Sequence, residues 1–176
     1  MYNVFFTVLP PFSIGVFDQF ISARLLDRYP QLYMLGQKGE FFNIRTFWTW
    51  ILNGFYHSAI AYVASTYFFV NDGIESNGQV AGHWVWGTTL YTAVLLTVIG
   101  KAALVTNTWT KWTIFAIPGS FIIWMIFLPI YAIVAPLVGF SREYFGIVPH
   151  LYGSLVFWAS IVVIPFMCLI RDFAWK

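Results

Sequence analysis

One polar stretch, residues 18–45, separates a first apolar run from four later ones and constrains what this chain can fold into. Its sequence, DQFISARLLDRYPQLYMLGQKGEFFNIR, holds four of the nine Lys and Arg residues of the chain. Soluble domains scatter their charges, and about 25% of their residues are charged. Here only 9% are charged and 60% are hydrophobic. The solvent for most of this chain is therefore lipid, and we predict an all-α bundle that crosses a membrane several times.

Five apolar runs are candidate transmembrane helices, because about 17–25 apolar residues cross the hydrocarbon layer. They are residues 1–17, 46–70, 84–105, 112–138 and 151–170. Prolines interrupt some of these runs. The adjacent Pro10 and Pro11 predict a break near Thr7 in the first helix. Pro118 and Pro129 predict a kinked or broken fourth helix.

The basic residues predict an orientation, because short loops rich in Lys and Arg stay in the cytosol. With residues 18–45 cytosolic, every Lys and Arg except Arg142 falls on the cytosolic side. Residues 71–83 contain no Lys or Arg and are then lumenal. Five spans with a cytosolic C-terminus place Met1 outside, and nothing at the start of the chain explains that placement. We therefore expect residues 1–176 to form one C-terminal transmembrane domain of a larger membrane protein.

A search for catalytic motifs is negative. The histidines lie in three separate segments without metal-ligand spacing, and the single Cys168 excludes a Cys-ligated cluster. Neither a Gly-rich phosphate loop nor a nucleophile elbow occurs. The carboxylates lie in loops or at span ends, so none is an obvious proton relay. We predict no catalytic residue, metal site or cofactor in this chain, and no nucleic acid partner.

Three polar features within the spans are candidates for function. Asn3 and Thr7 share a helix face beside the prolines, and form either a polar substrate site or, as the residues alone favour, an interhelical hydrogen bond. Asn53 and His57 also share a face, and bundle packing is favoured because nothing points them at a pathway. Lys101 lies near the end of its span, where snorkelling to the interface is the simpler explanation. The many aromatic residues are attributed to interfacial belts and packing.

Four stretches resemble the C-terminal part of P4-type ATPases, the phospholipid flippases. YNVFFTVLPPFSIGVFDQ (residues 2–19) is similar to their sixth transmembrane helix, and RLLDRYPQLYMLGQKGEFFN (residues 24–43) to the cytosolic loop that follows it. GKAALVTNTWT (residues 100–110) and RDFAWK (residues 171–176) are similar to the ends of their eighth and tenth helices. The resemblance covers the whole chain in order, and implies that the five spans correspond to helices six to ten. RYPQLY and GQKGEFF are most similar to the Golgi and endosomal aminophospholipid flippases.

This resemblance implies an activity that the chain does not perform alone. Members of the family use ATP to move phosphatidylserine or phosphatidylethanolamine from the exoplasmic to the cytosolic leaflet. Their phosphorylated Asp-Lys-Thr-Gly-Thr motif is absent here, so ATP and Mg²⁺ are expected in other domains and this chain alone should be inactive. The resemblance also implies integral membrane localisation in the trans-Golgi network or endosomes.

The same resemblance implies residues and partners. The Asn of the family's Tyr-Asn-Val pattern in helix six contacts the lipid head group, and here that residue is Asn3. This reverses the preference at Asn3 in favour of substrate binding, and Thr7 on the same face is assigned to the site with it. The outer loops, residues 71–83 and 139–150, would meet the Cdc50-type accessory subunit.

A basic pocket for a phosphoinositide is a further expectation. Arg45 begins the second span, and Arg171 and Lys176 follow the fifth on the same side as Lys101. If these helix ends are neighbours, as in flippases, they form a basic pocket of the kind that binds inositide head groups.

Two other hypotheses remain at this point. In the first, the chain is a non-enzymatic, truncated membrane protein that binds lipid or the accessory subunit without transport. In the second, it is an unrelated channel. The density of the family resemblance speaks against the channel.

Overall fold

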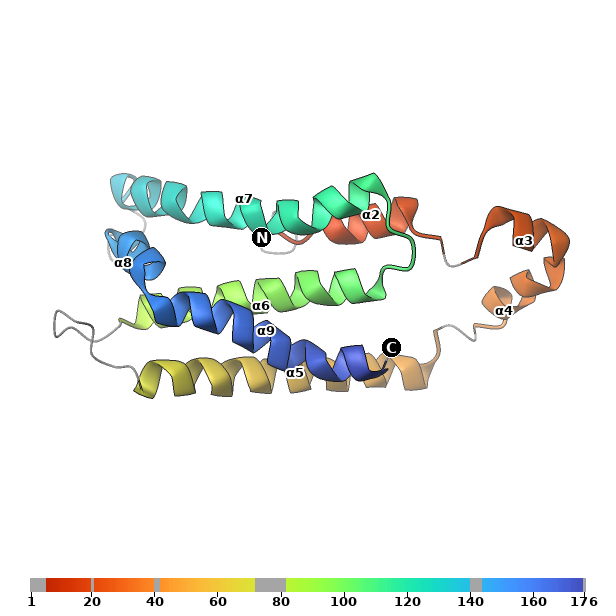
Figure 1. Ribbon diagram of the computed structural model, residues 1–176, viewed down its shortest axis with the longest axis horizontal. Coiled ribbons are helices and arrows are strands. Elements are labelled where there is room, and N and C mark those ends of the chain that lie inside the picture. Colours follow the sequence, from red (N-terminus) through yellow and green to blue (C-terminus); the bar gives the residue numbers. More distant parts are fainter. Residues whose placement is uncertain (1–5, 20, 40–41, 72–81, 140–143, 176) are drawn as a thin grey trace.

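The computed structural model describes residues 6–19, 21–39, 42–71, 82–139 and 144–175, and every regular element in these ranges is helical. The elements are α2 (Leu9–Phe17), α3 (Ala23–Arg28), the 3₁₀ turn η1 (Pro30–Leu32), α4 (Tyr33–Gln37), α5 (Ile44–Asn71), α6 (His83–Val105), α7 (Lys111–Leu137), α8 (Ile147–Gly153) and α9 (Leu155–Trp175). In Figure 1 the long helices lie side by side, with α2 and α7 on one side of α6 and α5 and α9 on the other. The all-α prediction is confirmed for these ranges.

Three of the described helices, α6, α7 and α9, are long and apolar enough to cross a membrane. Large apolar side chains also cover the outside of the bundle: Ile126, Ile133, Val162 and Phe166 are each more than half exposed. Apolar surface on this scale is covered by lipid or by a partner in a stable protein. The chain is therefore an integral membrane protein.

The prediction of five transmembrane helices is met only in part. Helix α2 has nine residues and is too short to span by itself. Helix α5 has 28 residues, but its Trp, Tyr, Asn and His side chains make it less apolar than α6, α7 and α9. Residues 1–5 of the first predicted span lie outside the described residues.

The prolines have different effects in the two helices that they were expected to interrupt. Pro10 lies in the first turn of α2, where its missing N–H costs nothing, and Thr7 precedes the helix in a turn. Thr7 is therefore non-helical, as the prediction requires, while residues 1–5 on the other side of the predicted break lie outside the described residues. Helix α7 instead runs without interruption through Pro118 and Pro129, so a broken fourth helix is wrong. Membrane helices accommodate proline because local adjustments and neighbouring groups satisfy the freed carbonyls.

The bounds of the fifth predicted span, residues 151–170, differ from those of the helices in the structure. Ser154 has extended backbone and separates α8 from α9, and α9 continues to Trp175. The indole N–H of Trp158 donates to the Tyr152 carbonyl across this break, at 2.9 Å. Because α9 extends further than predicted, Asp172 is held on a helix.

Helix α6 is the centre of the bundle and contacts α2, α5, α7, α8 and α9. Gly100 allows α9 to approach closely, since a Cβ atom there would run into the side chain of Leu169. Four threonine hydroxyls on α6 donate to carbonyls one turn earlier in the same helix (Thr88, Thr89, Thr92 and Thr97). These hydroxyls are thereby satisfied in an apolar setting.

The polar stretch, residues 18–45, contains α3, η1 and α4, which lie beyond one end of the bundle (Figure 1). Asp18 ties its start to the connection between α6 and α7. Its carboxylate accepts the backbone N–H of Thr108 at 2.6 Å and that of Asn107 at 3.2 Å, and the Thr108 hydroxyl donates to the Gln19 carbonyl at 3.0 Å. The two connections lie at the same end, as the charge distribution predicts.

Candidate functional site

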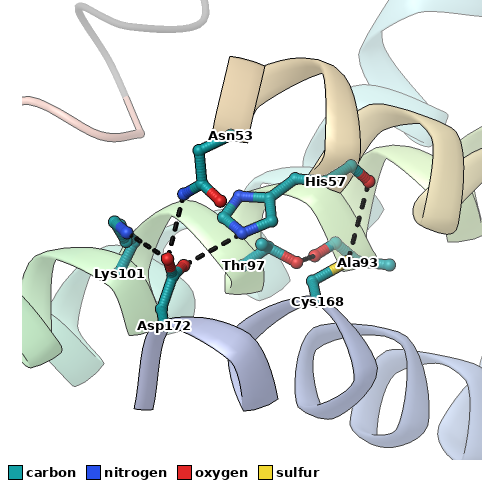
Figure 2. Close-up of polar contacts among 7 residues, drawn as sticks. All are labelled: Asn53, His57, Ala93, Thr97, Lys101, Cys168 and Asp172. Atoms are coloured by element: carbon teal, nitrogen blue, oxygen red, sulfur yellow. Dashed lines mark hydrogen bonds and ion pairs between the residues drawn. The ribbon is translucent and has the colours of Figure 1, made fainter. Parts of the chain in front are cut away.

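The carboxylate of Asp172 is a polar junction between three helices (Figure 2). Lys101 Nζ on α6 lies 2.6 Å from Oδ1. The amide of Asn53 on α5 donates to the same oxygen at 3.0 Å. His57 Nε2, also on α5, lies 2.9 Å from Oδ2, and the two side chains form an ion pair when the imidazole is protonated. We call these four residues the Asp172 cluster.

The cluster follows from helical spacing and close packing. Asn53 and His57 are four residues apart and therefore share the face of α5 that meets α9. One turn before Asp172, the Cys168 thiol donates to the His57 carbonyl at 3.6 Å. On α6, the adjacent Gly100 packs against the Leu169 side chain of α9, and Lys101 reaches the carboxylate one residue further on.

Partial burial strengthens the electrostatics of the cluster. The exposed fractions of the side chains are 10% for Asp172, 16% for His57 and 22% for Lys101. Attraction between opposite charges increases as water is removed from between them. Removing one partner would therefore destabilise the protein, because the other charge would stay partly buried without a counter-charge.

Aromatic rings hold the two basic residues near this end of the helices. Lys101 Nζ lies 4.8 Å from the centre of the Trp50 ring, and the Arg171 guanidinium lies 5.0 Å from the centre of the Tyr56 ring. Such cation–π contacts fix a cation without neutralising its charge.

A cavity of about 360 Å³ opens beside the cluster and is lined by Thr49, Trp50, Asn53, Lys101, Leu104, Val105, Arg171, Asp172 and Trp175. A second cavity of about 430 Å³ shares Trp50, Asn53 and Lys101, and continues between α5 and α6 past Ala61, Leu90 and Val94. Both volumes fall within the range of small-molecule sites, about 300–1,000 Å³. The pair provides a charged end joined to an apolar end, which suits an amphiphile.

The structure brings together part of the predicted basic pocket. Lys101 and Arg171 both line the first cavity. Arg45 is exposed in the first turn of α5, and among the described residues it is not part of that lining. Lys176 lies outside the described residues. Snorkelling is therefore an incomplete account of Lys101, whose ammonium is paired with Asp172.

Thr7, the described one of the two predicted substrate residues, lies elsewhere, just before α2. Asn3 is outside the described residues. Thr7 is 6% exposed. Next to it, the Phe6 ring packs edge-on against Trp124 with centroids 4.9 Å apart, and the Trp124 indole N–H donates to Thr92 at 3.0 Å. The non-helical segment before α2 is thus anchored to α7 and, through Trp124, to α6.

Sequence reasoning assigned no role to Asp172 and attributed Asn53 and His57 to packing. The two α5 residues do join helices, but they also line the cavities. The available signal was their spacing on one face, which called for a polar partner at the same depth. Within the ranges that the structure describes, no group of three His, Cys, Asp or Glu side chains is placed to hold a metal ion.

These observations define a helical integral membrane protein with a charged cavity where three helices converge. The whole chain, residues 1–176, matches the family model described as the C-terminal region of phospholipid-translocating P-type ATPases, and the chain belongs to that family.

Individual relatives carry the same description. A phospholipid-transporting ATPase of Schizosaccharomyces pombe is 60% identical over 176 residues, which are 100% of this chain and 14% of that protein. The phospholipid-transporting ATPase DRS2 of Saccharomyces cerevisiae is 57% identical, over 99% of this chain and 13% of its own length. The phospholipid-transporting ATPase tat-1 of Caenorhabditis elegans is 31% identical, over 100% of this chain and 16% of its own length. The chain therefore spans less than one fifth of each of these relatives.

Proposed function

We propose that this chain is the C-terminal membrane domain of an ATP-driven transporter that moves phosphatidylserine and phosphatidylethanolamine from the exoplasmic to the cytosolic leaflet. The match of all 176 residues to the family is the observation that carries this proposal. Relatives named phospholipid-transporting ATPases support lipid as the substrate. ATP and Mg²⁺ would be bound by parts of the whole protein outside these residues, and this domain would act as scaffold and as one wall of the lipid path.

Five spans are part of the proposal. At about 1.5 Å per residue, α5 is about 42 Å long and exceeds the hydrocarbon core of about 30 Å. It lies along α6 and α9, both of which are apolar enough to span. Its Trp and Tyr side chains lower its hydropathy while suiting the two interfaces. Residues 1–8 together with α2 would form the first span.

The lipid path would pass the start of α2. Irregular backbone at membrane depth is tolerated where it packs in protein or lines a cavity, and the turn that contains Thr7 precedes a helix with two prolines near its start. We assign Asn3 and Thr7 to contact with the lipid head group. The contacts of Phe6 with Trp124 would hold this segment in place.

The cavity beside the Asp172 cluster would bind a regulatory phosphoinositide. Lys101 and Arg171 line it, and Arg45 lies in the first turn of α5. Lys176, which lies outside the described residues, would complete the basic set. The apolar second cavity offers room for an acyl chain. Basic pockets between helices at the cytosolic side suit such head groups.

Partner and compartment complete the proposal. The loops at residues 71–83 and 139–150 would meet a Cdc50-type accessory subunit on the lumenal side, and the membrane would be that of the trans-Golgi network or endosomes.

Reconstitution of the complete protein tests the proposed function. In phosphatidylcholine vesicles, phosphatidylserine should stimulate ATP hydrolysis, and fluorescent phosphatidylserine should accumulate in the cytosolic leaflet only with ATP. ATP hydrolysis that is indifferent to aminophospholipids would contradict the proposal.

A further inference from the structure

The charge of Lys101 is already neutralised inside the cavity that it lines. Its ammonium lies 2.6 Å from Asp172 Oδ1, and both side chains line the same space. An anion that enters therefore meets a carboxylate together with the lysine. The cavity is therefore lined by charges of both signs, and the Asp172 carboxylate competes with any entering anion for Lys101.

The two members of this ion pair are held differently. Asp172 is the more buried, and Asn53 and His57 hold it from α5 without involving Lys101. Lys101 is the more exposed, and its ammonium lies over the Trp50 ring at the edge of the cavity. Arg171, the other described basic side chain in the lining, is placed over Tyr56. When Lys101 leaves, Asp172 retains the hydrogen bond from Asn53 and the close contact of its other oxygen with His57 Nε2.

We propose that Asp172 is an internal competitor for Lys101, and that this competition selects membrane lipids whose head group carries a phosphomonoester. Without ligand, Asp172 forms an ion pair with Lys101. When such a head group enters, Lys101 exchanges Asp172 for the phosphate, while Asn53 and His57 retain the carboxylate. The inference rests on the lipid-binding role proposed above for this cavity.

Charge decides which lipid can make this exchange. A phosphomonoester carries a charge of about −1.5 to −2 at neutral pH. The phosphodiester of an ordinary anionic lipid carries a single negative charge, no more than the carboxylate that it would displace. A phosphodiester therefore gains little from the exchange, whereas a phosphomonoester gains the additional attraction. Asp172 thus lowers the affinity for every anion but penalises the weaker ones most.

The experiment titrates the complete protein with lipid and measures bound lipid and stimulated ATP turnover. The vesicles contain phosphatidylcholine with either phosphatidylinositol monophosphate or phosphatidylglycerol, and thermal unfolding is measured for every variant. For Asp172→Asn we expect the apparent affinity for phosphatidylinositol monophosphate to rise about fivefold, the scale of a partly exposed ion pair. Phosphatidylglycerol, which we expect the wild type to bind poorly, should now compete.

Two variants identify the mechanism. Combining Lys101→Gln with Asp172→Asn should abolish the gain, because no ammonium is left to release. Asp27→Asn removes the same charge from exposed α3 and should change neither affinity nor selectivity. A gain that persists in the Lys101→Gln background would show long-range repulsion and overturn the competition.

A second test keeps the charge of Asp172, in case Asp172→Asn does not fold. Asn53→Leu and His57→Phe remove the alternative partners of Asp172, so it should hold Lys101 more firmly and weaken phosphatidylinositol monophosphate binding severalfold. Unchanged binding in both folded variants would refute the proposal.

The same titrations distinguish failure of the competition from failure of the proposed lipid-binding role of the cavity. A wild-type protein that binds neither lipid would contradict that lipid-binding role. A wild type that responds, but whose selectivity Asp172→Asn leaves unaltered, would contradict only the competition. Inorganic phosphate or soluble inositol phosphate that fully replaces the lipid would contradict a membrane source.

Discussion

Single polar residues in this bundle are satisfied in two ways. Thr89 and Thr97 donate to their own helix, so their hydroxyls need no neighbour. The amide of Asn53 and the ammonium of Lys101 instead meet Asp172 on another helix. The hydrogen bond of Asn53 and the ion pair of Lys101 link helices, so we expect their loss to weaken the contacts of α5 and α6 with α9.

Asn3→Ala in the complete protein should impair phosphatidylserine-stimulated ATP turnover. A hydrogen bond to a charged head group would be lost, which is worth about 1.5–3 kcal/mol. The apparent lipid affinity, measured at matched expression, should fall with the turnover. Ser22→Ala, at an exposed position without a side-chain cap bond, is the control. Unchanged lipid dependence in Asn3→Ala would rule out the assignment.

Asp18 gives a pH dependence with a definite sign. Burial raises the pKa of Asp18, but hydrogen bonds from the Thr108 and Asn107 backbone N–H groups outweigh it and lower the pKa below its ordinary value. A lowered folded-state pKa stabilises the protein above the unfolded pKa of about 3.9 and is lost as pH falls through the folded value. Asp18→Asn should therefore be less stable than the wild type at pH 7, with the gap closing below about pH 4. Thermal unfolding in detergent measures it; a gap that widens in acid would contradict the hydrogen-bonded carboxylate.

Among the helices, α6 and α9 pack closely at Gly100, where the end of the Leu169 side chain occupies the space that a Cβ atom would take. Gly100→Leu should push the two helices apart and lower the free energy of unfolding by about 1–3 kcal/mol, as overpacking does. It should also lengthen the distance from Lys101 to Asp172. Gly87→Leu on the same helix is the matched control, because a Cβ atom there meets nothing within 4 Å. Equal unfolding temperatures for the two variants would show that this packing is unimportant.

For the whole molecule, the charge distribution predicts which loops face the cytosol. Cys168, the single cysteine of the chain, is fully buried. A thiol-labelling reagent therefore reacts with an introduced, exposed cysteine rather than with Cys168. In sealed vesicles, Gln37→Cys should react with an impermeant maleimide from the cytosolic face and Asn77→Cys from the lumenal face. Reaction of Asn77→Cys from the cytosolic face alone would invert the topology.

The sequence predicted the helical class and most helix positions because long apolar runs leave few alternatives in lipid. The sequence-based prediction was wrong or incomplete where contacts between distant elements determine a helix end or the role of a side chain. The end of the fifth run extended to Trp175 because α9 packs on α5 and α6, which no local pattern reveals. For the same reason Lys101 was found as a candidate, whereas Asp172 was missed: its role exists only once three helices have met.

The central place of α6 has a consequence for biogenesis. A ribosome delivers α6 before α7, α8 and α9, so Lys101 reaches the bilayer while the segment that carries Asp172 is still unmade. Until then the lysine must stay at the interface or be shielded by an insertion chaperone, because an unpaired charge within lipid is costly. The ion pair between Lys101 and Asp172 can form only after α9 has been translated, so it is one of the last contacts of this domain to be made.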